Sequence, residues 1–159
     1  MESSFLFLDF DGVLHAERYD DLLSLMGKKT SDDYGALFSP SAVRNMRRII
    51  DATDAGIVIA SNWRHFGLEQ MRKMWKGRSL PGEIVGVLPY LPESNDVVRG
   101  QEIEHWLEEN NAQDSRFAII DDRNDFLPWQ FRYLVLTNHK RGITLRVAFK
   151  VIKILQGRW

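Results

Sequence analysis

The feature that most constrains this chain is an apolar run at residues 5–8 that leads directly into Asp9, Asp11 and Gly12. A short apolar run that ends in a turn signal is typical of a strand buried on both faces of a parallel sheet. Carboxylates two residues apart on an extended chain point the same way. Because ligand sites in open α/β sheets lie at the carboxyl ends of strands, the pattern predicts a site here. A strand followed by an ordinary acidic turn is the alternative interpretation.

The rest of the chain alternates between apolar runs and segments with helical periodicity. Further strands are expected at residues 56–60, 84–88, 117–120 and 133–136, and helices at 40–55, 67–75, 99–110 and from 144 onward. This alternation favours a parallel sheet with right-handed crossovers. We therefore expect an α/β fold, a three-layer doubly wound (Rossmann-like) parallel sheet of about five strands.

The segments that fall outside these elements are short. Residues 16–39 are expected to form an excursion with one short helix that ends at Gly27, and residues 89–98 a loop. Gly56 is expected to stop the helix that begins after Ser39. With 159 residues, the chain is expected to be a single domain over 1–159.

Composition excludes several classes of function. The chain has no cysteine, which rules out disulfides, thiol catalysis and thiolate metal sites. No apolar run is long enough for a spanning helix, and the N-terminus lacks the pattern of a secretory signal. We therefore expect a cytoplasmic protein with no membrane partner. A net charge of −1 means that any binding of nucleic acid depends on a local basic patch.

Polar residues follow the expected strands at the points where those strands end. Asp9 and Asp11 follow the first strand, Ser61 follows the second, and Asp121 and Asp122 follow the fourth. These ends lie at one edge of a parallel sheet, where several bare carboxylates would repel one another. Mg²⁺ with oxygen ligands relieves that repulsion and favours a phosphate beside it.

In this order, the residues resemble the motifs of the haloacid dehalogenase (HAD) superfamily of aspartyl-phosphate phosphotransferases. The first motif is matched by residues 9–13, the second by Ser61, and the fourth by residues 121–122. The third is a basic residue on a helix before the fourth strand, and Arg99 is its best match. The family usually has lysine there, and a guanidinium contacts oxygens differently. Lys140 or Arg141 could serve instead.

Within the superfamily, the chain is most similar to the HAD domain of the "Swiss army knife" RNA-repair proteins. The similar stretches are residues 61–64, residues 99–103 with Trp106, and residues 142–144. The gaps after the first motif and between the second and third motifs have no room for a cap domain. The resemblance therefore implies a HAD-like core with an open, capless site, which suits a macromolecular end better than a small metabolite.

The resemblance also implies roles for individual residues. Asp9 would be the nucleophile, and Asp11 the acid and base for the leaving group and for water. Mg²⁺ would be held by Asp9, the Asp11 backbone carbonyl and Asp122, with Asp121 beside it. The phosphoryl oxygens would be bound by Ser61, Asn62 and Arg99. Which of Asp121, Asp122 and Asp125 binds the metal stays open, with Asp125 expected to be a turn residue.

The implied function is a Mg²⁺-dependent phosphomonoester hydrolase with a phosphorylated substrate, such as a nucleic-acid (RNA) end. Two alternatives remain: a HAD fold that only binds, and a phosphatase of small metabolites. A receiver domain is disfavoured because residues 88–90 lack an acceptor aspartate at the end of the third strand.

Other residues near the expected site receive weaker assignments. Trp63 is expected to pack beneath the site, and no role is assigned to His15, His65 or His139. Several cations could form a basic flank for a polynucleotide, or merely a solvated helix face: Arg64, Arg72, Lys73, Lys76, Arg78 and residues 139–141.

Overall fold

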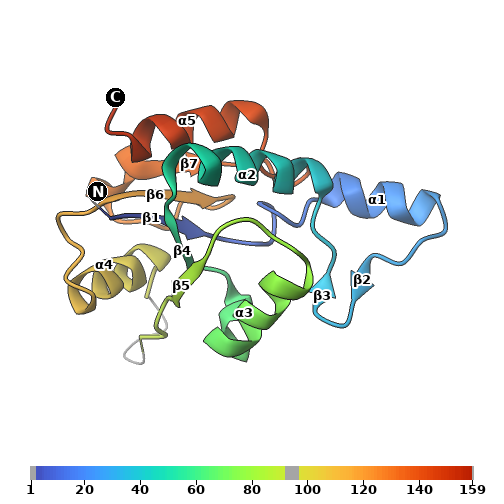
Figure 1. The fold of residues 1–159 in the computed structure, drawn as a ribbon, viewed down its shortest axis with the longest axis horizontal. Helices are drawn as coiled ribbons and strands as arrows, with labels where there is room; N and C mark the ends of the chain where they lie inside the picture. Colours follow the sequence, from blue (N-terminus) through green and yellow to red (C-terminus); the bar gives the residue numbers. More distant parts are fainter. Residues whose placement is uncertain (1–2, 92–96, 159) are drawn as a thin grey trace.

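A computed structural model describes residues 3–91 and 97–158 and contains a five-stranded sheet in the order β5-β4-β1-β6-β7. Every neighbouring pair in this sheet is parallel (Figure 1). The strands are β1 (Ser4–Leu8), β4 (Gly56–Ile59), β5 (Ile84–Val87), β6 (Arg116–Asp121) and β7 (Leu134–Leu136). The expected α/β class and the five parallel strands are confirmed.

Helices cover both faces of the sheet and define two cores. Helices α2 (Pro40–Thr53) and α5 (Leu145–Leu155) lie side by side on one face, where α3 (Leu68–Gly77) joins the same core near β5. Helix α4 (Arg99–Glu109) covers the other face. Alternate side chains of β1 enter each core: Leu6 and Leu8 face α2 and α5, whereas Phe7 contacts Trp106 of α4 edge-on at 5.5 Å.

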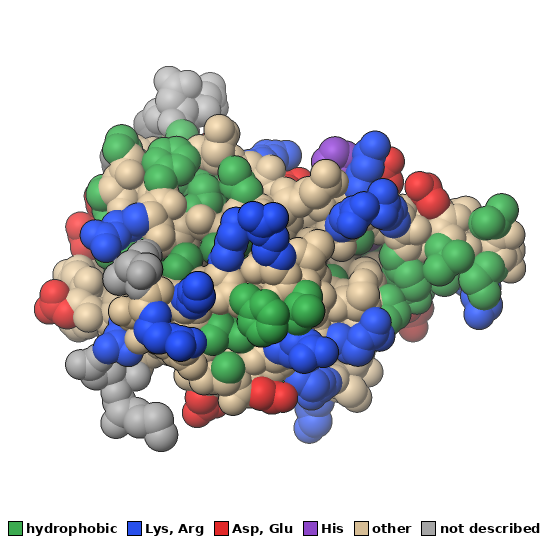
Figure 2. All heavy atoms as spheres, turned by 90° about the horizontal axis from the view of Figure 1, so that it is seen from above, with side chains coloured by type: hydrophobic (Ala, Val, Ile, Leu, Met, Phe, Trp, Pro, Cys, Tyr) green, Lys and Arg blue, Asp and Glu red, His purple; other side chains and the backbone are tan. Residues whose placement is uncertain are grey.

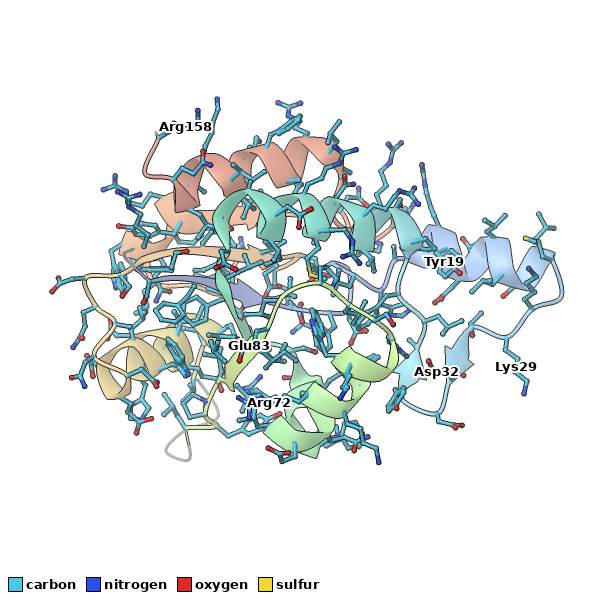
Figure 3. The ribbon with its side chains drawn as sticks, in the orientation of Figure 1. Tyr19, Lys29, Asp32, Arg72, Glu83 and Arg158 are labelled. Carbon is cyan, nitrogen blue, oxygen red and sulfur yellow. The ribbon has the colours of Figure 1, made fainter. Side chains whose placement is uncertain are left out.

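The excursion after β1 extends to one side of the sheet. It contains α1 (Glu17–Leu25) and a small antiparallel hairpin of β2 (Ser31–Asp32) and β3 (Gly35–Ala36). Figure 3 shows Lys29 and Asp32 in this region, away from the sheet. The short helix was expected and the hairpin was not. Over residues 3–91 and 97–158, no further domain is inserted after the first motif or between the second and third motifs. This agrees with a capless core.

Two 3₁₀ helices complete the chain, η1 (Asn62–Phe66) after β4 and η2 (Pro128–Tyr133) before β7. Tyr133 therefore ends η2 instead of starting the last strand. Residues 92–96 of the expected loop lie outside the described residues. Within the described part of the chain, the helices are too short or too polar to cross a membrane.

The expected stop of α2 at Gly56 is wrong. Helix α2 ends at Thr53, and Asp54 adopts a left-handed conformation (φ 51°) while its N–H donates to the Ile50 carbonyl at 2.8 Å. Gly56 instead begins β4, where an added Cβ would lie 3.0 Å from the Val85 side chain. This glycine is needed for close approach to the neighbouring strand and not for a helix cap.

Candidate active site

Three carboxylates meet at the carboxyl edge of the sheet. Asp9 follows β1, Asp121 is the last residue of β6, and Asp122 comes next. One carboxylate oxygen from each lies within 4.8 Å of the other two. The pairing of β1 with β6 fixes this arrangement, and the Asp9 N–H continues it by donating to the Ile120 carbonyl at 3.2 Å. An all-oxygen set of this kind fits a hard divalent cation such as Mg²⁺.

Burial and mutual repulsion raise the pKa values of two of these carboxylates, and a bound cation would relieve the repulsion. Burial, followed by the charge of Asp121, raises the pKa of Asp9 from 3.8 to about 8. The Phe10 N–H, 2.8 Å from Asp9 Oδ1, and the Arg99 charge only partly offset this rise. Burial raises the pKa of Asp121 to about 6, against the N–H of Arg123 and the charge of Arg99. Bound divalent charge would reverse these shifts.

Gly12 gives Asp122 its place beside the loop after β1. Its backbone has a φ of +80°, and an added Cβ would lie 2.7 Å from Cγ of Asp122. Thr137, directly after β7, donates its hydroxyl to the Gly12 carbonyl at 2.7 Å. Only glycine both adopts this conformation and leaves room for the carboxylate.

Asp11 is exposed and is held by different partners from those of the three clustered carboxylates. Its Oδ1 lies 2.9 Å from His15 Nδ1, and its Oδ2 accepts a hydrogen bond from the Trp63 indole at 3.3 Å. The second nitrogen of His15 lies 2.6 Å from Asp20 Oδ2. Burial acts to lower the pKa of His15, but its hydrogen bonds to Asp20 and Asp11 raise it overall. Asp11 is thus oriented by two rings.

Ser61 and Asn62 lie at the neighbouring strand end. Ser61 is buried and caps η1, since its Oγ accepts the Trp63 N–H at 3.2 Å. A hydroxyl that accepts one hydrogen bond still has its own hydrogen to donate. Asn62 is exposed, and its Oδ1 accepts a hydrogen bond from Arg99 Nη2 at 3.2 Å. Trp63 packs edge-on against Phe10 at 5.3 Å, beneath the loop.

Arg99, the first residue of α4, extends toward the same edge. Its Nε lies 3.3 Å from Glu102, and its charge opposes the raised pKa values of both Asp9 and Asp121. Its Nη1 is buried and has no hydrogen-bond partner among the described residues. A buried guanidinium nitrogen of this kind has an unused N–H donor, which an anionic oxygen could accept.

Arg64 does not belong to a basic flank, so that part of the expectation is wrong. It is 4% exposed, and its Nη2 lies 2.6 Å from Glu102 on α4. Arg78 pairs instead with Asp32 of the hairpin at 2.7 Å. Arg72 donates to the Ile84 carbonyl, and Figure 3 shows it near Glu83 at the outer end of the sheet. Lys73 and Lys76 remain exposed on α3.

Sequence reasoning gave no role to His15 or to Glu102, although both matter to the geometry. His15 lies four residues after Asp11, a spacing that could have drawn attention to it. Glu102 joins Arg64 and Arg99 across two elements, so no local pattern marks it. Asp125 lies in the loop after β6, outside the group of three carboxylates, and its carbonyl accepts the Gly100 N–H of α4 at 3.1 Å.

A parallel α/β sheet with clustered aspartates at its carboxyl edge is consistent with a Rossmann-like HAD core. Residues 5–148 match the family model described as the HAD domain in Swiss Army Knife RNA repair proteins, and the chain belongs to this family. No match was found among curated proteins.

Proposed function

We propose that this domain is a Mg²⁺-dependent phosphomonoester hydrolase that forms an aspartyl phosphate at Asp9 and acts on phosphorylated nucleic-acid ends. The observation that carries the proposal is the group of Asp9, Asp121 and Asp122 within 4.8 Å, with Arg99 beside it. The fold family supports a phosphatase-type hydrolase with a divalent metal. The RNA end is suggested by the name of the family.

The proposed first step is phosphoryl transfer to Asp9. A carboxylate oxygen of Asp9 bonds to phosphorus while the bond from phosphorus to the leaving oxygen breaks, and Asp11 donates a proton to that oxygen. Asp11 is suited to this because His15 and Trp63 orient it outside the clustered carboxylates. In the second step, Asp11 takes a proton from water, which attacks phosphorus and releases Asp9 and inorganic phosphate.

The remaining residues hold the transferring group. Arg99 Nη1 and the Ser61 hydroxyl are the donors proposed for its oxygens, and Asn62 orients Arg99. Bound Mg²⁺ would neutralise the clustered carboxylates and stabilise the charge that develops on the phosphoryl oxygens. Asp9, Asp122 and the Asp11 carbonyl are its proposed ligands, with Asp121 beside them. The cytoplasmic location remains a prediction.

The test is Mg²⁺-dependent hydrolysis of 4-nitrophenyl phosphate by the wild type, by Asp9→Asn and by Asp114→Asn. Asp114 is an exposed aspartate in the turn before β6, remote from the carboxyl edge, and is the control. We expect Asp9→Asn to lower kcat by about a thousandfold or more and Asp114→Asn to leave it unchanged. Equal rates in all three proteins would rule out the mechanism.

A substrate panel separates the alternatives. Sugar phosphates, nucleotides and end-phosphorylated oligonucleotides are compared by kcat/KM, and the proposal predicts the highest value for an oligonucleotide. A preference for a small metabolite would contradict the proposed substrate class. Binding of Mg²⁺ without hydrolysis of any member would indicate a module that only binds.

A further inference from the structure

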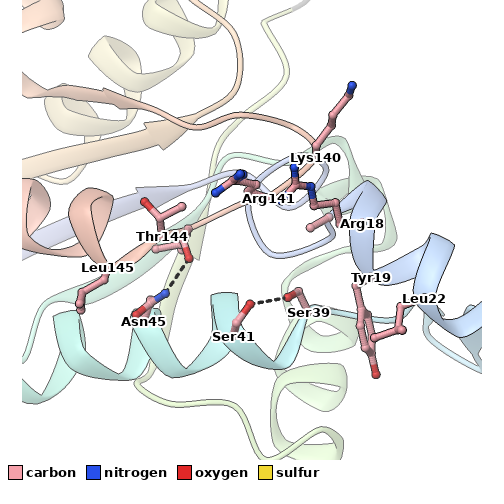
Figure 4. A pocket seen from close by; sticks show the side chains of 12 residues that line it. Arg18, Tyr19, Leu22, Ser39, Ser41, Asn45, Lys140, Arg141, Thr144 and Leu145 are labelled. Carbon is pink, nitrogen blue, oxygen red and sulfur yellow. Dashed lines mark hydrogen bonds between the residues drawn. The ribbon is translucent and has the colours of Figure 1, made fainter.

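A pocket with a volume of about 440 Å³ lies among α1, the start of α2 and the segment that leads into α5. Arg18, Lys140 and Arg141 line it, together with the hydroxyls of Ser39 and Ser41. Figure 4 shows Arg18 and Arg141 on the loop side and the two serines on the α2 side, while Lys140 extends away. Within the described part of the chain, these three cations form no ion pair. Their charge is therefore free for an anionic ligand.

Backbone hydrogen bonds connect the residues that line this pocket to the loop after β1, which follows Asp9. The Ile143 N–H donates to the Val13 carbonyl at 2.9 Å, and the Arg18 N–H donates to the Lys140 carbonyl at 3.0 Å. The residues after β7 therefore line the pocket on one side and contact the loop after β1 on the other. Gly12 of that loop lies so close to the Asp122 side chain that an added Cβ would clash with it. The pocket and the carboxylates are thus separated by these two paired segments.

The N-terminal ends of two helices also line the pocket. Helix α2 begins at Pro40, between Ser39 and Ser41, and α5 begins at Leu145 after its cap Thr144, and all but Pro40 line the pocket. The backbone N–H groups and dipole of a helix N-terminus favour anions. Together with the three cations, they make the pocket suitable for a phosphate group.

The outer face of α2 and α5 continues the positive charge away from the pocket. Its exposed cations are Arg44, Arg47, Arg48, Arg146, Lys150 and Lys153. Helix α5 has no acidic residue and α2 has one, although the whole chain has a net charge of −1. Leu145 and Phe149 are 44% and 55% exposed on α5 between these cations. Figure 2 shows Lys and Arg side chains spread over this face with hydrophobic side chains among them.

We propose that the pocket and this basic face bind the phosphodiester backbone of the nucleic-acid strand whose phosphorylated end reaches Asp9. The inference rests on the proposed function, since it supplies a track for that substrate. Cations repeated beyond the pocket match a ligand with many phosphates, and an exposed aromatic ring among them suits a stacked base. A membrane is disfavoured because only two of the eight apolar side chains of α5, Leu145 and Phe149, are exposed.

The test measures binding of a labelled, end-phosphorylated single-stranded RNA of about 12 nucleotides by fluorescence anisotropy at several salt concentrations. The pocket variant is Arg18→Gln/Lys140→Gln/Arg141→Gln, and the face variant is Arg146→Gln/Lys150→Gln/Lys153→Gln. Each is expected to raise Kd about tenfold or more and to reduce the slope of log K against log salt by about 2. The charge control is Lys28→Gln/Lys29→Gln on the excursion, which is expected to bind like the wild type.

A rival surface is tested in the same way with Lys73→Gln/Lys76→Gln on α3. Weaker binding of RNA by this variant, with normal binding by the pocket and face variants, would overturn the proposal. Inorganic phosphate and vesicles of phosphatidylcholine with phosphatidylserine are tested as two further ligands. Saturation of the pocket by phosphate without displacement of RNA, or binding of vesicles in place of RNA, would also overturn it.

Activity measurements on the pocket and face variants distinguish failure of this inference from failure of the proposed function. For an active enzyme, the ratio of kcat/KM on the oligonucleotide to that on 4-nitrophenyl phosphate is expected to fall about tenfold in the pocket and face variants. If no phosphomonoester is hydrolysed but both variants still lose RNA binding, the proposed function fails and the binding track stands. If hydrolysis is confirmed and RNA binding is unchanged, the track fails alone.

Discussion

His15 Nδ1 lies 2.9 Å from Oδ1 of Asp11, so an imidazole holds the carboxylate proposed as the general acid. Asp20 anchors the opposite side of the ring at 2.6 Å. Partners that fix a catalytic group commonly contribute tenfold or more to activity. We predict that His15→Ala lowers kcat by about ten- to a hundredfold with little change in KM, because the role proposed for Asp11 is proton transfer and not substrate binding.

The measurement is steady-state hydrolysis of a phosphomonoester with a poor leaving group, for which protonation by Asp11 matters most. His139→Ala is the control, because His139 is exposed and pairs only at the surface with Glu17 at 3.2 Å. Equal kcat values for the two variants would show that His15 has no positioning role.

The buried ion pair between Arg64 and Glu102 is predicted to contribute strongly to the stability of the fold around the site. Arg64→Ala leaves Glu102 buried and without this partner, which should reduce the free energy of unfolding by about 3–5 kcal/mol. Glu69→Ala removes a solvent-exposed pair with Arg72 at 3.6 Å, leaves the Arg72 hydrogen bond to the Ile84 carbonyl in place, and should cost less than about 1 kcal/mol. Urea denaturation of both variants measures the difference, and similar losses would contradict this account.

The clustered carboxylates predict an unusual pH dependence for the metal-free protein. The pKa of Asp9 is raised from 3.8 to about 8, so the folded state binds more protons than the unfolded state between these values. The stability from this group is therefore complete below about pH 4 and is lost as the pH rises through about 8. Asp121 acts in the same direction up to about pH 6.

Mg²⁺ should offset this loss, because it favours the ionised carboxylates. We predict that adding Mg²⁺ raises Tm more at about pH 9 than at about pH 5, where protons compete for Asp9. Thermal scans with and without Mg²⁺ test this, with Asp9→Asn as the comparison that removes most of the effect. A Tm shift that is independent of pH would argue against metal binding by these carboxylates.

Gly12→Ala is predicted to damage the metal site more than the fold. The new methyl group would meet the Asp122 carboxylate, and alanine is strained at a φ of +80°. We expect Mg²⁺ affinity to fall about tenfold or more, measured by calorimetric titration. Gly27→Ala is the control, because Gly27 also has a positive φ but has nothing within 4 Å of an added Cβ. Unchanged affinity in Gly12→Ala would contradict the proposed role of Asp122.

The strands were predictable because each is a short apolar run, and the runs of β1, β4, β6 and β7 lead directly into polar residues. The edge shared by Asp9, Asp121 and Asp122 follows directly from parallel pairing of those runs. The η1 and η2 helices were missed because 3₁₀ helices of five and six residues carry little periodicity. The β2–β3 hairpin has only two residues in each strand, too few for an alternating pattern.

Side-chain partners were harder to predict than strand ends. Arg64 reads as a surface cation in sequence, and only the approach of α4 to η1 places Glu102 against it. The partners of Asp11 come from residues four and 52 positions away, and the second distance leaves no local signal. The basic face of α2 and α5 likewise exists only because the two helices pack side by side.

The most direct test of the central claim is chemical trapping of the proposed intermediate. Asp11→Asn is mixed with 4-nitrophenyl phosphate and Mg²⁺, quenched and reduced with borohydride, which converts an aspartyl phosphate to homoserine. Because nitrophenolate leaves without an acid whereas water needs a base, the intermediate should accumulate, and peptide mass spectrometry should find homoserine at position 9. Homoserine at position 121 or 122, or at no aspartate while nitrophenolate is released, would contradict the account.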